Sequence, residues 1–402
     1  MIFLQRLHDR HLVFKGEITV FLSLIFVLLL SFVGAMIEFT SISVTKSMKQ
    51  ADMEMAMESV FAEYEAELLK RYGIFAKRGS DLYSITHRLS YYGGENMDHE
   101  IIHMELLSDH KGQEFYRQAV ACMGGKADQD KPSINHPYEN KAQSIKEQFE
   151  ALKIEIPELE KVSHIFLLER ILPKEKIISN RSIELSKLPS HRELQSGIGT
   201  LLEVDKTLLG KSLFITYLKH HFSNYTDNSN ENPLFYETEY LLAGKSSDKA
   251  NLEWVAKRLL SIRLSVNYGF LLSNEEKLAK AETISLGIST VLAIPEAKEV
   301  IKQAFLFFWA YEDSLEDLKS LFAGEKVPLG ENQEGKSAGY EEYLHALLFA
   351  ANTEKLCMRA LDIIESNLNL PVDHCVTALE LESRGYTRRN IRYTCKTDFA
   401  YQ

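Results

Sequence analysis

A long run of apolar side chains near the start of the chain is the clearest feature of its hydrophobic pattern. Residues 18–37 contain no charged side chain, and fourteen of them are Leu, Ile, Phe or Val. A helix of this length, at about 1.5 Å per residue, crosses the roughly 30 Å hydrocarbon core of a bilayer. The fourteen side chains favour insertion by about 4–8 kcal/mol. The pattern therefore predicts a transmembrane helix that contacts membrane lipid.

A cleaved secretory signal is the alternative interpretation, because Val33, Gly34 and Ala35 resemble a small-residue cleavage site. The apolar core exceeds the usual length of about 7–15 residues, and the helical pattern continues beyond it, which favours a retained anchor. The flanking basic residues predict a single-pass protein of the cell membrane with a cytoplasmic N-terminus and an extracytoplasmic C-terminal domain. Three of them precede the run and two follow it: Arg6, Arg10, Lys15, Lys46 and Lys49.

The helical pattern continues after the apolar run, to about Lys70. Apolar residues recur there at spacings of three to five, with Glu and Lys on the opposite face: Met48, Met53, Met57, Val60, Phe61, Tyr64 and Leu68. Because no Pro or Gly interrupts residues 35–72, we expect one long helix over 17–70. A separate juxtamembrane helix is the alternative.

The remainder alternates between short β-type segments and long helical ones. Strands are predicted near 72–77, 99–107, 373–383 and 389–400, and helices near 139–153, 206–223, 234–243, 249–266, 275–292, 296–323 and 338–367. The fold class is therefore α+β, with a small antiparallel sheet in a mostly helical extracytoplasmic domain. The expected organisation is a tail (1–16), the long helix (17–70) and the domain (71–402), with a helical insertion at about 139–367. Residues 171–199 are irregular, and such long loops are either functional or packed as ordered coil.

Composition and motifs give no support for an enzyme. The net charge of −11 argues against nucleic acid as a partner. Two Gly-Lys-Ser triplets, at 210–212 and 244–246, lack the earlier glycine of a phosphate-binding loop, since Asp205 and Glu239 occupy that position. Glu342 and His345 form a single Glu-x-x-His, whereas di-iron bundles need two. We expect no catalytic, cofactor or metal site.

The cysteine spacings include no CxxC pair, so a zinc site is not expected, but they suggest one disulfide. Cys375 and Cys395 lie ten residues on either side of Gly385, which sits in a polar break between two β-type segments. A hairpin turn at Gly385 would place the two cysteines opposite each other, near the upper limit of disulfide reach. A register shift of one residue would put them on opposite faces and prevent the bond.

Several blocks of sequence resemble one known family. They are KGEITVFLSLIFVLLL with AEYEAELLKRYGIFA, then KIISNRSIELSKLPSHRELQSGIG, and then LFYETEYLLAGKSSDKANLEWVAKRLLSIRLSVNY through WAYEDSLEDLKSLFAGEKVPL. The family is a membrane-anchored one of unknown function from Gram-positive bacteria. Its members are associated with Tad-like pilus or type II secretion-like gene clusters. The resemblance implies other pilus or secretion-assembly proteins as partners and implies no known activity.

The opening also resembles the leader of pilins and pseudopilins, which a prepilin peptidase cuts after a glycine. Lys15, Gly16 and Glu17 fit that pattern and are the predicted processing site. Pilins usually carry a glutamate at the fifth position after the cut, which is Phe21 here. From the family resemblance we expect a non-enzymatic component of a pilus-like or secretion-like envelope assembly. The alternative is a stand-alone anchored ectodomain that binds a surface or cell-wall ligand.

Overall fold

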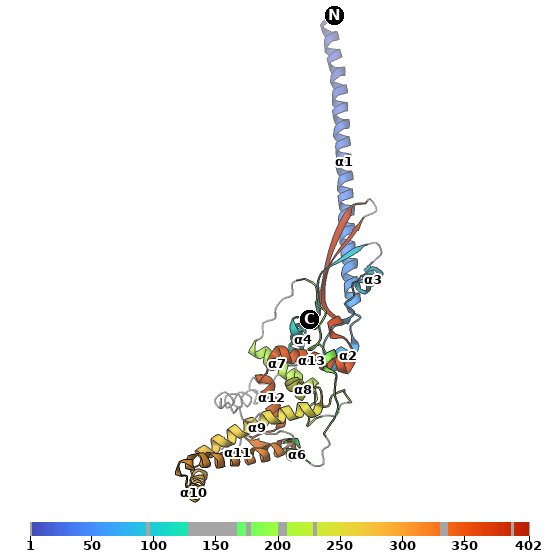
Figure 1. The fold of residues 1–402 in the computed structure, drawn as a ribbon. Helices are drawn as coiled ribbons and strands as arrows, with labels where there is room; N and C mark the ends of the chain where they lie inside the picture. The colour runs from blue at the N-terminus through green and yellow to red at the C-terminus, as the bar shows by residue number, and fades with distance from the viewer. Residues whose placement is uncertain are drawn as a thin grey trace. The chain divides into compact units, whose positions relative to one another are not determined.

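The computed structural model describes residues 2–93, 97–127, 167–173, 178–199, 207–227, 231–329, 337–386 and 390–401. Figure 1 shows the fold as a ribbon. The chain divides into two compact units. Unit 1 contains Met1–Glu63, Gly79–Met104 and Ala378–Ala400, and unit 2 contains Tyr64–Arg78, Glu105–Thr377 and Tyr401–Gln402. The predicted fold class is confirmed, because helices predominate and an antiparallel sheet accompanies one long N-terminal helix.

The long helix of unit 1, α1, extends over Ile2–Phe61. Residues 18–37 are exposed throughout, as a segment surrounded by lipid would be. Among the described residues, α1 supplies the one helix that is long and apolar enough to cross a membrane. The chain therefore has the length and composition of a single-pass membrane anchor.

The later part of α1 is built into a folded body. Met53, Met57, Val60 and Phe61 are buried, as the stripe predicted, whereas Met48 is exposed. Here α1 contacts α3 (Leu82–Gly93) and β6 (Arg392–Ala400). The Phe61 ring stacks on Phe399 of β6 with ring centroids 4.4 Å apart. Burial of this face stabilises the part of the helix that follows the apolar segment.

The helix ends at Phe61 and not near Lys70. A second helix, α2, begins at Ala66 and ends at Tyr72. Between them the backbone N–H of Glu65 donates to the carbonyl of Ala76, 2.9 Å away, and not to the preceding helix. This tertiary hydrogen bond favours a turn that the helix-forming sequence does not reveal. The single helix predicted over 17–70 therefore continues from the apolar segment as far as Phe61, and residues 66–72 form a short helix of their own.

The main sheet is antiparallel and contains β1 (Lys77–Arg78), β2 (Asp98–Leu106), β5 (Cys375–Tyr386) and β6. Strand β5 pairs with each of the others. Its register with β6 extends from Ala378 opposite Ala400 to Tyr386 opposite Arg392. Strand β5 is thus the centre of the sheet, and its partner β2 precedes the helical region in sequence, whereas β5 and β6 follow it.

The predicted turn at Gly385 is wrong. Gly385 lies within β5, opposite Tyr393. A Cβ atom added to Gly385 would stand 2.6 Å from the Tyr393 hydroxyl, so the glycine makes room for a ring and does not form a turn. The chain reverses between Tyr386 and Arg392, where Asn390 adopts a left-handed conformation with φ 59°. Asparagine tolerates that conformation better than most residues.

The predicted pairing of Cys375 with Cys395 fails for the same reason. With the turn moved, Cys395 lies opposite Ser383, and Cys375 lies opposite Arg78 of β1. All four cysteines are free in the structure. Burial raises the pKa of the Cys375 thiol to about 12, which makes it an unreactive core residue.

Unit 2 is mostly helical. Its helices are α4 (Asp109–Ala127), α6 (Leu167–Ile171), α7 (Leu208–His221), α8 (Glu237–Ala243), α9 (Asp248–Ser273), α10 (Glu275–Val291), α11 (Lys298–Phe322), α12 (Tyr340–Ala350) and α13 (Thr353–Leu368). A small strand pair joins Val327–Pro328 (β3) to Ser337–Ala338 (β4). The predicted helix at 338–367 is two helices, because Asn352 caps α13 by accepting from the Lys355 N–H. The predicted helix at 139–153 lies outside the described residues.

The core of unit 2 is rich in aromatic rings. Eight of the contributing side chains are Tyr72, Phe115, Phe214, Tyr217, Tyr225, Tyr236, Phe322 and Tyr340. Phe214 and Tyr217 project from α7 towards Phe115 of α4. Rings of this size bury about 150–250 Å² each, so this cluster supplies much of the apolar burial that stabilises unit 2.

Candidate functional site

The irregular stretch predicted in the middle of the chain is an ordered coil. Residues 178–199, here called the coil segment, contain one short helical turn (Leu185–Lys187) and isolated bridge residues such as Ser182, which pairs with Ser247. A coil of this length needs partners for its backbone groups other than those of regular structure. Buried carboxylates of the surrounding helices supply several of them.

Asp248, the first residue of α9, fixes the start of the coil segment. The Ser179 hydroxyl donates to Asp248 Oδ2 at 2.5 Å. The backbone N–H groups of Phe235 and Tyr236 donate to the same carboxylate at 3.1 Å. The Tyr236 hydroxyl in turn accepts from the Ser179 N–H at 3.1 Å. Asp248 is completely buried, so each of these donors replaces a water that the carboxylate has lost.

Asp362 of α13 holds the middle of the coil segment. It accepts from the Ser190 N–H at 2.8 Å and from the Ser190 hydroxyl at 2.5 Å. The Tyr240 hydroxyl of α8 adds a third donor at 2.7 Å. Burial raises the pKa of Asp362, and the hydrogen bonds from Ser190 and Tyr240 oppose that rise.

Two further aspartates hold the end of the coil segment. Asp373 accepts from the Arg192 guanidinium at 2.6 Å and from the Gln195 N–H at 3.2 Å. Asp109, at the start of α4, accepts from the Gly197 N–H at 3.1 Å. Both carboxylates accept hydrogen bonds from groups of the protein. Among the described residues no group of three or more His, Cys, Asp and Glu side chains could hold a metal ion.

The short helix α8 carries two more buried acids. Glu237 accepts from Ser223, Asn232 and Asn367. Glu239 Oε1 accepts from the Tyr225 N–H at 2.9 Å and from the Tyr340 hydroxyl at 2.6 Å. Its Oε2 atom has no hydrogen-bond partner among the described residues. Burial therefore raises the pKa of Glu239 to about 7.

Replacing Glu239 with Gln should stabilise the protein above neutral pH. The unfolded carboxyl has a pKa near 4.5 and the folded one a pKa of about 7. The proton bound by the folded state is thus a source of stability that is present below pH 4.5 and lost as the pH rises through 7. The glutamine has no proton to lose, so at pH 8 the variant should be more stable by about 3 kcal/mol.

Urea unfolding of the detergent-solubilised protein at pH 5 and pH 8 measures this difference. The two proteins should converge towards pH 5 and separate at pH 8. Equal stabilities at pH 8 would contradict a buried carboxyl at this position whose Oε2 atom has no donor. Glu253→Gln is the matched control, since that acid forms a surface pair with Lys257 at 2.8 Å.

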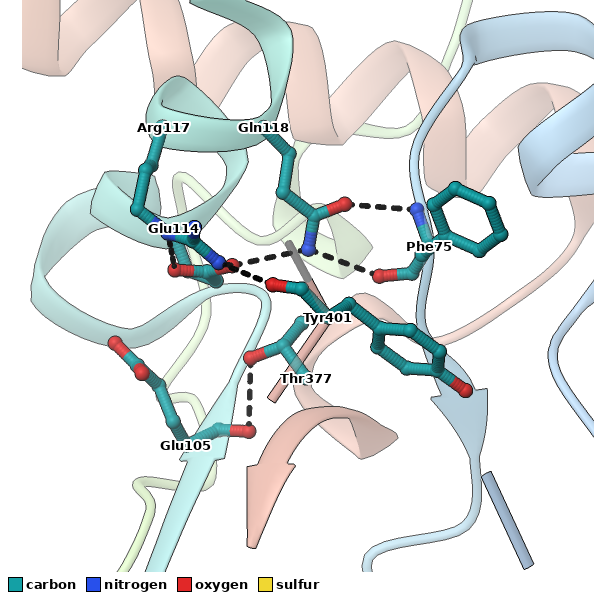
Figure 2. A network of polar contacts seen from close by, with 7 residues as sticks. All are labelled: Phe75, Glu105, Glu114, Arg117, Gln118, Thr377 and Tyr401. Carbon is teal, nitrogen blue, oxygen red and sulfur yellow. Dashed lines mark hydrogen bonds and ion pairs between the residues drawn. The ribbon is translucent and has the colours of Figure 1, made fainter. Parts of the chain in front are cut away.

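A second polar network lies where α4 meets two distant segments of unit 2 (Figure 2). The Gln118 side chain bonds both the N–H and the carbonyl of Phe75, at 2.8 and 3.0 Å. Arg117 forms a two-armed pair with Glu114, at 2.6 and 2.8 Å, and donates to the backbone carbonyl of Tyr401 at 2.6 Å. The side chains thus replace the sheet-type partners that residues 75 and 401 would otherwise need.

Glu105 and Thr377 border this network (Figure 2). The Thr377 hydroxyl donates to the Glu105 carbonyl at 3.1 Å. Burial and the nearby Glu114 raise the pKa of the Glu105 carboxyl to about 7, while Arg117 lowers it. The hydrogen bonds of this network tie α4 to residues 75 and 401, and residue 377 to residue 105, so they stabilise the fold of unit 2.

The residues singled out by sequence motifs lie in, or at the end of, different helices, α1, α7 and α8. Lys15, Gly16 and Glu17 lie inside α1, where the helix is continuous. Gly210 belongs to α7, and a Cβ there would stand 2.8 Å from the Tyr116 hydroxyl. Gly244 ends α8 in a left-handed conformation with φ 64°. The first glycine thus makes room for the Tyr116 side chain, and the second allows α8 to end.

Comparisons with known proteins give one match. Residues 146–334 and 330–385 match the model of a family described as a family of unknown function, DUF5702. The matched residues make up more than half of the chain and include the coil segment and the aspartates of α9 and α13. No curated protein and no solved structure matches the chain.

Proposed function

We propose that this chain, which belongs to the DUF5702 family of unknown function, is a non-enzymatic, membrane-anchored component of a Tad-like pilus or type II secretion-like envelope assembly. The observation that carries the proposal is the construction of α1. Its exposed apolar segment, 18–37, continues without a break to residues 53–61, where one face of the helix is buried in a folded unit. A continuous helix of this kind couples a membrane span rigidly to a folded body, as a structural subunit requires.

The chemistry of the described residues supports a structural role. The buried carboxylates of Asp248, Asp362 and Asp373 accept hydrogen bonds from backbone and side-chain donors, which is how polar groups stabilise a fold. We propose that the N-terminus is cytoplasmic and the folded units extracytoplasmic, in keeping with the basic residues before the span.

Cross-linking in native membranes, followed by affinity purification of the full chain, tests the assignment. Subunits or membrane-platform proteins of a pilus-like or secretion-like machine should co-purify. Met55→Lys changes an exposed side chain outside the buried stripe, so this variant should co-purify with the same proteins as the unaltered chain. Recovery of the chain with cell-wall material and no assembly protein would overturn the assignment and favour an anchored ligand-binding ectodomain.

The mature N-terminus provides a separate prediction. Intact-mass analysis of the membrane-extracted protein should give a chain that starts at Met1 or, after processing, at Glu17. If processing occurs, Gly16→Leu should abolish it, because a peptidase of this kind requires a small residue before the cut. A mature start at Met36 would show that residues 18–35 are a removed signal and would overturn the anchor.

A further inference from the structure

The first half of α11 is more apolar than a solvent-exposed helix should be. Residues 300–310 read VIKQAFLFFWA, in which Lys302 and Gln303 are the polar side chains. A helix that is apolar all round is normally buried on every side. Here one side is covered, because Leu306 and Ala310 pack in a small core with Leu264 and Leu271 of α9 and Ala281 of α10.

A different side of the same helix carries a continuous apolar stripe. Its members follow one another at spacings of three or four: Val300, Ala304, Phe307, Tyr311, Leu315, Leu318 and Phe322. From Leu315 onward the stripe is buried in the main core of unit 2. Before Tyr311 it is open, with Val300 71% exposed and Phe307 40% exposed. Phe308, next to the stripe, is 56% exposed.

The helix before α11 adds to this exposed surface. Residues 283–295 contain no charged side chain. Helix α10 packs through the small residues Ala281, Ser285 and Ser289, which are buried. Large side chains of α10 and of the turn that follows remain exposed: Ile284, Leu286, Val291, Leu292 and Ile294.

The exposed apolar surface of this helical hairpin is large enough for contact with a partner. A buried aromatic side chain covers about 150–250 Å², and at their exposed fractions the large apolar side chains of residues 284–308 leave on the order of 700 Å² uncovered, summed over α10, the turn and α11. A stable interface buries about 800 Å² per partner, so a contact of that size uses side chains of α10 as well as those of α11.

We propose that the face of α11 formed by Val300, Ala304, Phe307 and Phe308 binds the same face of a second copy of this chain. In an antiparallel helix pair centred on Ala304, the two small side chains let the helices approach closely. Val300 of each copy then packs against Phe308 of the other. A two-fold contact of this kind uses one patch twice, so each copy contributes the same stripe. The proposal goes beyond the assembly role above, because it names the surface and the partner.

Charge favours a second copy over a lipid surface. The acids and bases that flank the stripe pair within the hairpin: Lys280 with Glu276, Lys298 with Glu282, and Lys302 with Glu299, at 2.5–2.8 Å. Helices that lie on membranes carry a Lys- and Arg-rich polar face, whereas this hairpin is close to neutral and the whole chain has a net charge of −11. Chains anchored in one membrane also meet at high effective concentration.

Disulfide trapping of the full chain in native membranes tests the contact. Ala304→Cys should yield a covalent dimer on mild oxidation, because the two positions face each other across the two-fold axis. Ala279→Cys is the matched control, since Ala279 is exposed on the preceding helix but lies off the stripe. That variant should stay monomeric. Equal dimer yields from both variants, or none from Ala304→Cys, would overturn the proposal.

Charge substitution provides the second test. The double variant Val300→Lys, Phe308→Lys should weaken self-association of the detergent-solubilised chain at least 100-fold, measured by light scattering over a concentration series, since one desolvated lysine already costs about tenfold or more. Glu296→Lys and Glu299→Lys change the charge off the stripe and should leave the dissociation constant within about threefold.

A lipid-quenching measurement distinguishes the other occupant of this face. Because a label at position 304 would separate the two helices, a fluorophore is attached to the thiol introduced by Glu296→Cys, about one turn before Val300 and off the stripe. The labelled full chain is reconstituted in vesicles that contain a bromolipid. The fluorophore should keep its emission, because a second copy and not lipid covers the face. Quenching by the bromolipid would show that lipid covers it, and would also overturn the proposal.

Discussion

Phe61→Asp should destabilise unit 1 by about 4 kcal/mol or more. The side chain is 1% exposed and stacks on Phe399, so truncation alone costs about 3–5 kcal/mol. The new carboxylate would also be buried without a donor, which adds to the loss. Hydrogen exchange of the full chain in detergent should therefore show faster exchange of the amides of β6, residues 392–400, because that strand loses its contact with α1.

Met55→Asp provides the comparison for this change. Met55 lies on the same helix, 59% exposed, so the same new charge remains in water. We expect a change in stability below about 0.5 kcal/mol and unchanged exchange in β6. If both variants loosened β6 equally, the effect would come from charge on α1 and not from the packing of Phe61.

The elements that could be predicted from sequence are those with a local physical cause. The span of α1 follows from residues 18–37 alone, and the apolar period of α9 and α11 survives in the structure because one face of each packs in a core. The end of α1 at Phe61 could not be predicted in this way. It depends on a hydrogen bond between Glu65 and Ala76, which are distant enough that no local pattern records it.

The β5–β6 hairpin shows that a glycine in a β-type sequence can have two different structural causes. A glycine between two β-type segments marks either a turn or a close approach of another group. Gly385 serves the second purpose, under the ring of Tyr393, and the turn lies nearer Asn390. Because the turn does not lie at Gly385, Cys395 pairs with Ser383 and not with Cys375, so the disulfide prediction failed together with the turn.

The buried acids were the main feature that the sequence reading missed. Asp248 and Asp362 stand in ordinary helical patterns, where an acid usually faces water. One signal was available: Asp362 lies between Leu361 and Ile363 in a strongly apolar stretch, where an acid is out of place. Their partners, Ser179 and Ser190, lie 69 and 172 residues away in sequence, so the pairing needs the folded structure.

Asp248→Ala should release the start of the coil segment and lower the stability of unit 2 by about 3–5 kcal/mol. The substitution removes the acceptor of the Ser179 hydroxyl and of two backbone N–H groups, those of Phe235 and Tyr236. A buried donor left without an acceptor costs about 1–3 kcal/mol. Ser247 still caps α9 by accepting from the Ala250 N–H, so the helix itself should persist.

Limited trypsin digestion of the detergent-solubilised full chain should reveal the released segment, because Arg181 and Lys187 lie within it and are exposed. In Asp248→Ala, cleavage after these residues should be faster than in the unaltered protein, while sites in unit 1 are cut at the same rate. Asp248→Asn is the matched control, since its amide oxygen still accepts from the backbone and should limit the loss to about 1.5 kcal/mol. Equal protection of the coil segment in Asp248→Ala and the unaltered protein would show that the remaining ties, through Asp362 and Asp373, are enough to hold it.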